Sequence, residues 1–386
     1  MAALRALMAG ELPPVAARVR LRAGAPPPQF AGYHALWVDS GTSALALALL
    51  CARQGRPEIE TPAVIVPAYG CPDLVSAAEY AGVRPLLCDI GPDDPGYCLD
   101  ALRATLSPNV IAVVAVNFLG IAERLASIRE LIARAGISAA LIEDNAQWFP
   151  ERPDALQGEF VILSLGRGKP VSLLGGGCLL VSESNAAALN EAESVLANAG
   201  GPLGTSARWR AKCWLLNLLQ QRHLYRLATR NPWVTVGDTW YEPLQRVVPL
   251  GGRLAFVGAA ADRYLAQERW REMRLERAVA EVPGLVALPC ALRERARRLL
   301  RYPLLCHDRV QRDRLLQRAT EQGLGFTAMY RQPLIQIAGV AERVRVSGRT
   351  LTGAEQFAER LLTLPLHGGV SARDIERITA VLAAEA

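Results

Sequence analysis

The stretch Ala35-Leu36-Trp37-Val38-Asp39-Ser40-Gly41-Thr42-Ser43-Ala44-Leu45 joins an apolar, strand-like run to the first turn of a helix. Ser40 is a favourable N-cap residue, and Gly41 permits close approach of another group to the backbone. Free N–H groups at a helix N-terminus attract anions, so this turn has the features of a phosphate-binding loop. Helix capping alone would explain the same residues, and both interpretations stay open for this stretch.

Short apolar runs alternate with amphipathic segments from Ala35 to about Val181. Strands that are apolar along their whole length are buried on both faces, as in a parallel sheet covered by helices. Helices are expected near residues 43–53, 73–81, 98–106 and 123–135. The alternation predicts an α/β fold with a mostly parallel seven-stranded sheet. The seven expected strands are Leu36–Val38, Val64–Val66, Pro85–Cys88, Val110–Val116, Ala139–Ile142, Phe160–Leu163 and Cys178–Val181.

The large domain is expected over residues 34–250. The remaining segments predict an N-terminal arm before it, an insertion within it and a smaller domain after it. Residues 1–33 are rich in Pro, Ala and Arg and are expected to form an N-terminal arm. A Trp- and Arg-rich insertion is expected at about 203–248, with a helical stretch from Trp209 to Leu227 that Pro232 ends. Residues 251–386 are expected to form a smaller α+β domain. Its elements are a long linking helix from about Phe256 to Val282, a strand at Tyr302–Leu305, and helices near 309–322, 353–362 and 371–384.

Lysine occurs only twice in the chain, within a total of 43 basic residues. One lysine lies in Ser164-Leu165-Gly166-Arg167-Gly168-Lys169, between a strand-like run and a glycine-rich turn. Arginine covers surface and ion-pair roles, but it stays protonated and cannot form an imine with a carbonyl carbon. Lys169 is therefore a candidate imine-forming amine. Lys212, in a Trp- and Leu-rich helical stretch, is interpreted as a solvated head group.

A carboxylate motif follows another expected strand, at Glu143-Asp144-Asn145-Ala146-Gln147. A buried acid at a strand end needs a cationic partner, although capping of the next helix is the simpler interpretation. Gly175-Gly176-Gly177 lies beyond the lysine loop. Together the chain supplies a phosphate cradle, a carboxylate that can keep a pyridinium nitrogen protonated, and a lysine. Pyridoxal phosphate requires this combination.

Composition argues against several other classes of protein. The net charge of +6 is spread along the chain without an aromatic-interleaved basic stretch, so nucleic acid is not an expected partner. None of the four histidines is paired at i,i+4 with an acid, and no metal site is expected. The eight cysteines include no CxxC pair and indicate buried thiols in a reducing cytoplasm. The longest nearly apolar run, Val110 to Ala122, is too short to span a bilayer.

The chain resembles the DegT/StrS-type sugar aminotransferase family, whose members are fold type I pyridoxal phosphate enzymes. The resemblance covers nearly the whole chain apart from the arm and the insertion. The similar stretches are Ser40 to Leu45, Val64 to Tyr69, Ala81-Gly82-Val83-Arg84-Pro85…Asp89-Ile90, Glu143-Asp144-x-Ala146-Gln147, Ser164-x4-Lys169…Gly176-Gly177, and Ala358-Glu359-Arg360…Leu364-Pro365-Leu366-His367.

The resemblance implies a role for each matching residue. Lys169 would be the Schiff-base lysine, Asp144 the partner of the pyridine nitrogen, and Gln147 a neighbour of the ring hydroxyl. Cys71 stands where the family often has an aromatic ring stacked on the cofactor. Arg253 belongs to a loop similar to one that enters the neighbouring subunit of a homodimer, with Gly251 in place of the family's asparagine. The residues expected around the phosphate are Gly41, Thr42, Ser43 and Ser164.

The activity that the resemblance implies is transfer of an amino group, with glutamate or glutamine as donor, to a keto-sugar or related ketone. Such a reaction belongs to polysaccharide or secondary-metabolite biosynthesis. A keto-sugar dehydratase is an alternative, but a histidine replaces the lysine in that branch. A non-catalytic, cofactor-binding scaffold is the other alternative, motivated by Cys71 and Gly251. The insertion at 203–248 is interpreted as a dimer-interface or core-covering helix pair, with contact to a membrane surface and a hydrophobic acceptor as the alternative.

Overall fold

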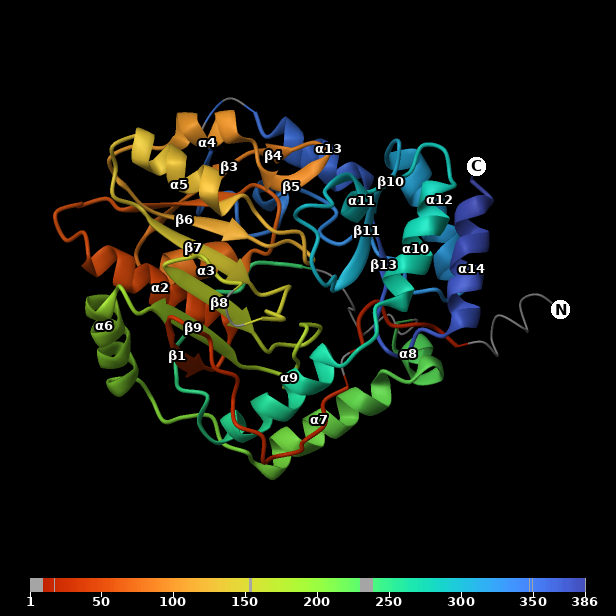
Figure 1. Cartoon of the computed structure of the whole chain (residues 1–386), viewed down its shortest axis with the longest axis horizontal. Coiled ribbons are helices and arrows are strands. Elements are labelled where there is room, and N and C mark those ends of the chain that lie inside the picture. The colour runs from red at the N-terminus through yellow and green to blue at the C-terminus, as the bar shows by residue number, and fades with distance from the viewer. Residues whose placement is uncertain are drawn as a thin grey trace.

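The computed structural model describes residues 10–385, apart from 17, 153–154, 230–238, 347 and 349. Its centre is an eight-stranded sheet with the order β1-β9-β8-β7-β6-β2-β3-β12 (Figure 1). Neighbours pair in parallel from β8 to β12, whereas β9 is antiparallel to both β8 and β1. The strands are β1 (Tyr33–Val38), β2 (Ala63–Pro67), β3 (Arg84–Cys88), β6 (Val110–Val116), β7 (Ala140–Asn145), β8 (Phe160–Ser164), β9 (Gly177–Ser182) and β12 (Arg345–Val346).

This sheet confirms the predicted mostly parallel architecture and contains all seven expected strands. The predicted number of strands needs one correction, because β12 joins the edge beside β3. A strand of two residues is too short to give a periodic pattern. It comes from the C-terminal part of the chain, so that part is hydrogen-bonded directly to the large sheet.

Side chains of the central strands alternate between two apolar layers. Val64 and Val66 of β2 pack in one cluster with α2, while Ile65 between them packs in another with α5. Helices α2 (Gly41–Gln54), α3 (Asp73–Tyr80) and α6 (Ala186–Ala197) share the first layer, and α4 (Leu99–Thr105) and α5 (Leu125–Arg134) share the second (Figure 1). A short hairpin of β4 (Ile90–Gly91) and β5 (Asp94–Tyr97) lies between β3 and α4 in the chain. Both faces of the sheet are therefore covered, which explains why its strands are apolar throughout.

The expected insertion contains two helices, α7 (Ala207–Leu219) and α8 (Arg222–Thr229). Pro232, which was expected to end the insertion's helical stretch, lies outside the described residues. The expected long linking helix is instead two helices, α9 (Val257–Leu265) and α10 (Trp270–Ala280), and the 3-10 helix η1 (Gly251–Phe256) precedes them. Arg298 donates hydrogen bonds to the carbonyl oxygens of Leu265 and Gln267, which satisfies backbone groups where α9 ends.

A second, antiparallel sheet organises the C-terminal part. It has the order β10-β11-β13, and helices α10, α12 and α14 pack beside it (Figure 1). Its elements are β10 (Val286–Ala287), α11 (Leu288–Ala291), β11 (Arg301–Leu305), α12 (Arg309–Glu321), η2 (Leu334–Gln336), α13 (Thr352–Arg360), β13 (Leu361–Pro365) and α14 (Ala372–Ala383). The division into domains at residues 250 and 251 stays a prediction.

The described residues of the N-terminal arm up to residue 32 run without helix or strand across the insertion and the C-terminal part, whereas Tyr33, the last residue of the predicted arm, already begins β1. The Val19 backbone exchanges two hydrogen bonds with the Asn217 side chain of α7, at 2.8 and 2.7 Å. The Leu12 N–H donates to the Gly323 carbonyl, and the Pro13 carbonyl accepts from His367. The arm therefore ties together segments that are far apart in the sequence.

Three findings concern the chemistry that the described part of the chain can support. None of its helices is long and apolar enough to cross a membrane. No group of three or more His, Cys, Asp or Glu side chains within it is arranged to hold a metal ion. All eight cysteines are free thiols.

Candidate active site

The predicted site residues lie where neighbouring strands of the large sheet end. Asp144 is near the carboxyl end of β7, Ser164 ends β8, and Ser40 lies two residues beyond the end of β1. Strands β1, β7 and β8 run in the same direction, so these ends share one edge of the sheet. Ligands of open α/β sheets bind at this edge.

The N-terminus of α2 forms the first wall of the site. Ser40 caps the helix, since its Oγ accepts from the Ser43 N–H at 2.9 Å, and the two hydroxyls lie 2.8 Å apart. Ser43 is completely buried, so its hydroxyl is engaged inside the cap. Gly41 and Thr42 are only partly buried and lie at the exposed end of the helix.

Gly41 brings this helix end against Ser164. A Cβ atom at position 41 would lie 2.8 Å from the Ser164 Cβ and 2.9 Å from its Oγ. Only glycine fits there without displacing the backbone or Ser164. A single site is therefore bordered by the bare Gly41 backbone, the N-terminus of α2 and the Ser164 hydroxyl. These groups fit a phosphate.

Asp144 supplies a buried carboxylate near the same edge. It is 7% exposed, and its Oδ1 accepts from the Ala146 N–H at 2.8 Å. Burial raises the pKa of this carboxyl, while the Ala146 hydrogen bond and the charge of Lys169 oppose the shift. No arginine, lysine or histidine of the described residues is within ion-pair distance of Asp144. A carboxylate in this setting fits a cationic ring nitrogen.

Glu143 is adjacent in sequence but plays a different part. Its Oε2 accepts from the backbone N–H groups of Gln157 and Gly158, at 2.8 and 3.0 Å. Its Oε1 accepts from the side-chain amides of Asn117 and Asn145, each at 3.1 Å. Successive strand residues point to opposite faces of a sheet. Glu143 is therefore satisfied within the protein, and Asp144 is the carboxylate available to a ligand.

Lys169 lies in the loop that follows β8 and is partly buried. A Cβ placed on Gly166 would lie 3.5 Å from the Ser164 Oγ and 3.7 Å from the Lys169 Cγ, so the two side chains flank the same glycine. The positive charge of Lys169 lowers the pKa values of both Asp144 and Cys71, against burial, which raises them. The lysine, the carboxylate and the phosphate cradle are thus neighbours.

Gln147 and Cys71 each lie near the Tyr330 hydroxyl. The Gln147 Oε1 accepts from the Leu119 N–H at 2.9 Å, and its Nε2 approaches the Tyr330 hydroxyl at 3.5 Å. Burial and the charge of Asp73 raise the pKa of Cys71 to about 12, so this thiol is protonated. Sequence reasoning missed Tyr330, which lies more than 180 residues beyond Gln147 and outside any recognised motif.

Arg253 lies against the glycine-rich segment of its own chain. Its Nη1 is 3.3 Å from the place of a Cβ on Gly175, and its guanidinium stacks on Trp209 at 4.7 Å from the ring centroid. Its Nε donates to the Gly204 carbonyl at 3.3 Å. The structure therefore brings Arg253 beside Gly175, and its predicted reach into a partner subunit stays a proposal.

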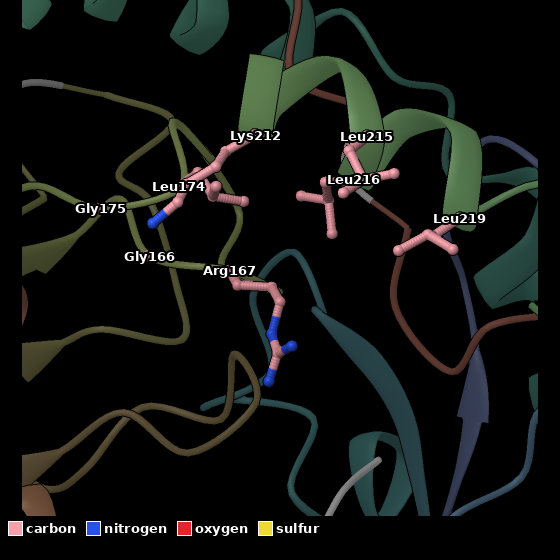
Figure 2. A pocket seen from close by; sticks show the side chains of 8 residues that line it. All are labelled: Gly166, Arg167, Leu174, Gly175, Lys212, Leu215, Leu216 and Leu219. Carbon is pink, nitrogen blue, oxygen red and sulfur yellow. The ribbon is translucent and has the colours of Figure 1, made fainter. Parts of the chain in front are cut away.

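A cavity of about 430 Å³ opens between the lysine loop and α7 (Figure 2). One wall is formed by the loop on either side of Lys169, and the other by leucines of the insertion. In Figure 2 the Arg167 side chain points away from α7. The lining residues are Gly166, Arg167, Leu174, Gly175, Lys212, Leu215, Leu216 and Leu219. The insertion is therefore part of the surroundings of the site.

Comparison with known proteins agrees with this geometry. A family model described as the DegT/DnrJ/EryC1/StrS aminotransferase family matches residues 29–206 and 259–383. The chain belongs to this family. The unmatched segment between the two ranges contains most of the insertion, η1 and the first residues of α9, and the N-terminal arm is also largely outside the match.

Two curated relatives match parts of the chain. It is 29% identical over 159 residues to a dTDP-3-amino-3,4,6-trideoxy-alpha-D-glucose transaminase of Micromonospora megalomicea subsp. nigra, covering 40% of this chain and 41% of that protein. It is 34% identical over 125 residues to an L-glutamine:2-deoxy-scyllo-inosose aminotransferase of Streptomyces kanamyceticus, covering 31% and 27%. The chain thus spans less than half the length of either relative.

Solved structures resemble the chain over most of its length. An aminotransferase, TlmJ, from Streptoalloteichus hindustanus superimposes with a TM-score of 0.66 at 21% identity, covering 91% of this chain and 85% of that chain. A putative sugar aminotransferase from Streptococcus pneumoniae gives 0.67 at 17% identity, covering 91% and 87%. These likenesses confirm the predicted fold type I architecture.

Proposed function

We propose that the protein is a pyridoxal phosphate-dependent aminotransferase that moves an amino group from an amino acid, expected to be glutamate or glutamine, to a keto-sugar or related ketone. The observation that carries this proposal is the grouping of Lys169, Ser164 and the bare Gly41 backbone near the buried carboxylate of Asp144. Family membership supports the same reaction class.

Each residue has a distinct part in the proposed reaction. Bound pyridoxal phosphate supplies an electron sink for the bonds at the reacting carbon. The α2 N-terminus and Ser164 hold the phosphate, and Asp144 orients the ring and keeps its nitrogen protonated. The Lys169 Nζ removes a proton from the donor α-carbon and later returns one to the former carbonyl carbon of the acceptor.

The two alternative functions are less well supported. A dehydratase of the same family would have a histidine at the position of Lys169. A non-catalytic scaffold that binds the cofactor would keep the same lysine and carboxylate, so release of keto acid is the observation that separates it from the aminotransferase. The free cysteines agree with a cytoplasmic location, which remains part of the proposal.

A homodimer is also part of the proposal. Helix α7 exposes the apolar side chains of Trp214, Leu215 and Leu219, by 66%, 48% and 39%. Such a face supports either a subunit interface or contact with a hydrophobic acceptor or membrane surface. Both interpretations of the insertion stay open, and the interface is the one that we favour.

A half-reaction without acceptor tests the function. Protein loaded with pyridoxal phosphate is mixed with glutamate, and the keto acid released is measured, with glutamine and alanine as parallel donors. We expect up to one equivalent of keto acid per subunit from wild type. Lys169→Ala should release none, whereas the matched control Lys212→Ala, which removes an exposed amine of α7, should still release keto acid. A loaded wild-type protein that releases keto acid from no donor would support the scaffold instead.

A further inference from the structure

Arg301 begins β11 and presents its guanidinium to neutral partners. Its Nη1 donates to the hydroxyl oxygens of Thr327 and Thr363, at 2.5 and 3.2 Å. Thr327 and Thr363 are themselves joined by backbone hydrogen bonds, which fixes the position of both hydroxyls. The two threonines therefore orient the guanidinium without neutralising it.

No carboxylate of the described residues lies within 4.0 Å of Arg301. Two other partly buried arginines do have such partners: Arg222 pairs with Asp374 at 2.6 Å, and Arg295 with Asp94 at 2.5 Å. Burial lowers the pKa of Arg301 to about 10, so it is still protonated at neutral pH. An enclosed charge without a counter-ion is unfavourable, and a bound anion would remove that cost.

The surroundings of Arg301 connect it to the candidate active site. Its charge lies near the hydroxyls of Tyr69 and Tyr330, whose rings are in edge contact at 5.7 Å. Tyr330 is the residue that approaches the Gln147 amide. Tyr330 therefore connects the Arg301 guanidinium to Gln147, the residue expected beside the cofactor ring.

Arg167 adds positive charge to the same region from the lysine loop. Burial and Glu11 raise the pKa of the Tyr225 hydroxyl on α8 to about 12, while the charges of Arg301 and Arg167 oppose the shift. Both arginines therefore act on one hydroxyl, although they come from β11 and from the loop after β8. An anion entering this region meets two cations.

We propose that Arg301 binds a carboxylate of the amino donor and of the keto acid formed from it. This inference rests on the proposed aminotransferase function and names the residue that selects its carboxylate substrates. The Nε and Nη2 groups of Arg301 have no hydrogen-bond partner among the described residues. Together they present two parallel N–H donors, the geometry that matches the two oxygens of a carboxylate.

Calorimetric titration with glutarate tests the proposal. Glutarate carries carboxylates but no amino or keto group, so it binds without reacting. The cofactor-loaded proteins to compare are wild type, Arg301→Gln, Arg301→Lys and the control Arg103→Gln, which alters an exposed arginine of α4. We expect Arg301→Gln to weaken glutarate binding about 10- to 100-fold, as for loss of charge-assisted hydrogen bonds. Arg301→Lys should be intermediate, because lysine keeps the charge but not the planar fork.

Two results would overturn the proposal: glutarate affinity unchanged in folded Arg301→Gln, or no glutarate binding by wild type. A parallel titration with pyrophosphate separates a carboxylate site from a phosphate site. Loss of pyrophosphate binding in Arg301→Gln, with glutarate binding retained, would assign the arginine to the phosphate of an acceptor and also overturn it.

The outcome is separable from that of the proposed function. If wild type forms keto acid but its glutarate binding does not depend on Arg301, the proposed aminotransferase function stands and Arg301 is not the residue that binds the carboxylate. If glutarate binding depends on Arg301 but the protein forms keto acid from no donor, Arg301 binds carboxylates and the proposed aminotransferase function is wrong.

Discussion

Asp144 and Glu143 show how one strand gives two neighbouring carboxylates different tasks. Glu143 accepts four hydrogen bonds and stabilises the local structure. Asp144, on the opposite face of the strand, has a carboxyl group whose pKa is raised by burial and no cationic partner among the described residues. In the proposed function, the protonated ring nitrogen of the cofactor is the cation that pairs with the Asp144 carboxylate.

We predict that Asp144→Asn retains the cofactor but lowers turnover about 100- to 1,000-fold, because the amide cannot stabilise the charge on the ring nitrogen. Steady-state kinetics and cofactor content measure the two effects separately. Glu143→Gln is the matched control. It should lower the free energy of unfolding and have a smaller effect than Asp144→Asn on the turnover per folded molecule. Near-normal turnover in Asp144→Asn would remove Asp144 from the proposed role.

Gly41→Ala tests the phosphate cradle. The added methyl group would lie 2.8 Å from the Ser164 Cβ, so we expect a loss of about 1–3 kcal/mol in the free energy of unfolding, together with weaker cofactor binding. Gly166→Ala is the control in the same region, since its Cβ would make ordinary contacts at 3.5 and 3.7 Å. Equal stability of the two variants in denaturant unfolding would contradict the close packing.

Sequence reasoning reached the residues of the site that sit in local motifs. Lys169 stood out because lysine is rare here, and Asp144 because an acid follows a buried strand. Tyr330 and Arg301 escaped notice because they approach the site only through tertiary folding, from segments without a local signature. The engagement of Ser43 with Ser40 likewise needed the geometry of the helix cap.

At the scale of elements, the long apolar strands were predictable because each is buried on both faces. The direction of β9 was not, since an apolar run carries no orientation. At the break between α9 and α10, Arg298 binds the carbonyl groups of Leu265 and Gln267 from more than 30 residues away. Contacts of this range leave no periodic pattern in the sequence.

The arm is fastened to the C-terminal part through a neutral histidine. The Nε2 of His367 donates to the Pro13 carbonyl at 2.8 Å, while its Nδ1 accepts from the Gly369 N–H at 3.1 Å. Burial, assisted by the charges of nearby arginines, lowers the pKa of His367 to about 4, against the Pro13 hydrogen bond, which raises it. The native protein therefore resists protonation of this ring, whereas the unfolded chain accepts the proton near pH 6.5.

We predict that His367 makes the protein less stable as the pH falls from about 6.5 toward 4. In that window the unfolded chain binds the additional proton, which lowers the free energy of unfolding by up to about 1.4 kcal/mol per pH unit. Urea unfolding across this range should show a shallower pH dependence for His367→Gln than for wild type. The control His307→Gln, at an exposed position, should retain the wild-type slope. Identical slopes for wild type and His367→Gln would contradict the prediction.

At the scale of the whole molecule, the proposed dimer determines whether Arg253 contributes to the active site of its own subunit or to that of the partner. In the single chain it stacks on Trp209 beside Gly175, and the resemblance implies that it also enters the partner's site. We predict that the inactive variants Lys169→Ala and Arg253→Ala regain activity when mixed under conditions of subunit exchange. One site of each mixed dimer would then hold both intact residues. A monomer by sedimentation, or no rescue despite exchange, would confine Arg253 to its own subunit.

The central claim is that Lys169 is the amine that holds pyridoxal phosphate, and the scarcity of lysine makes one measurement decisive. The protein is incubated with the cofactor, reduced with borohydride and digested, and the modified peptide is identified by mass spectrometry. We predict modification at Lys169, none at Lys212, and loss of the lysine label in Lys169→Arg, because the guanidinium stays protonated. Modification confined to Lys212 or the N-terminal amine, or absent altogether from protein saturated with cofactor, would contradict the claim.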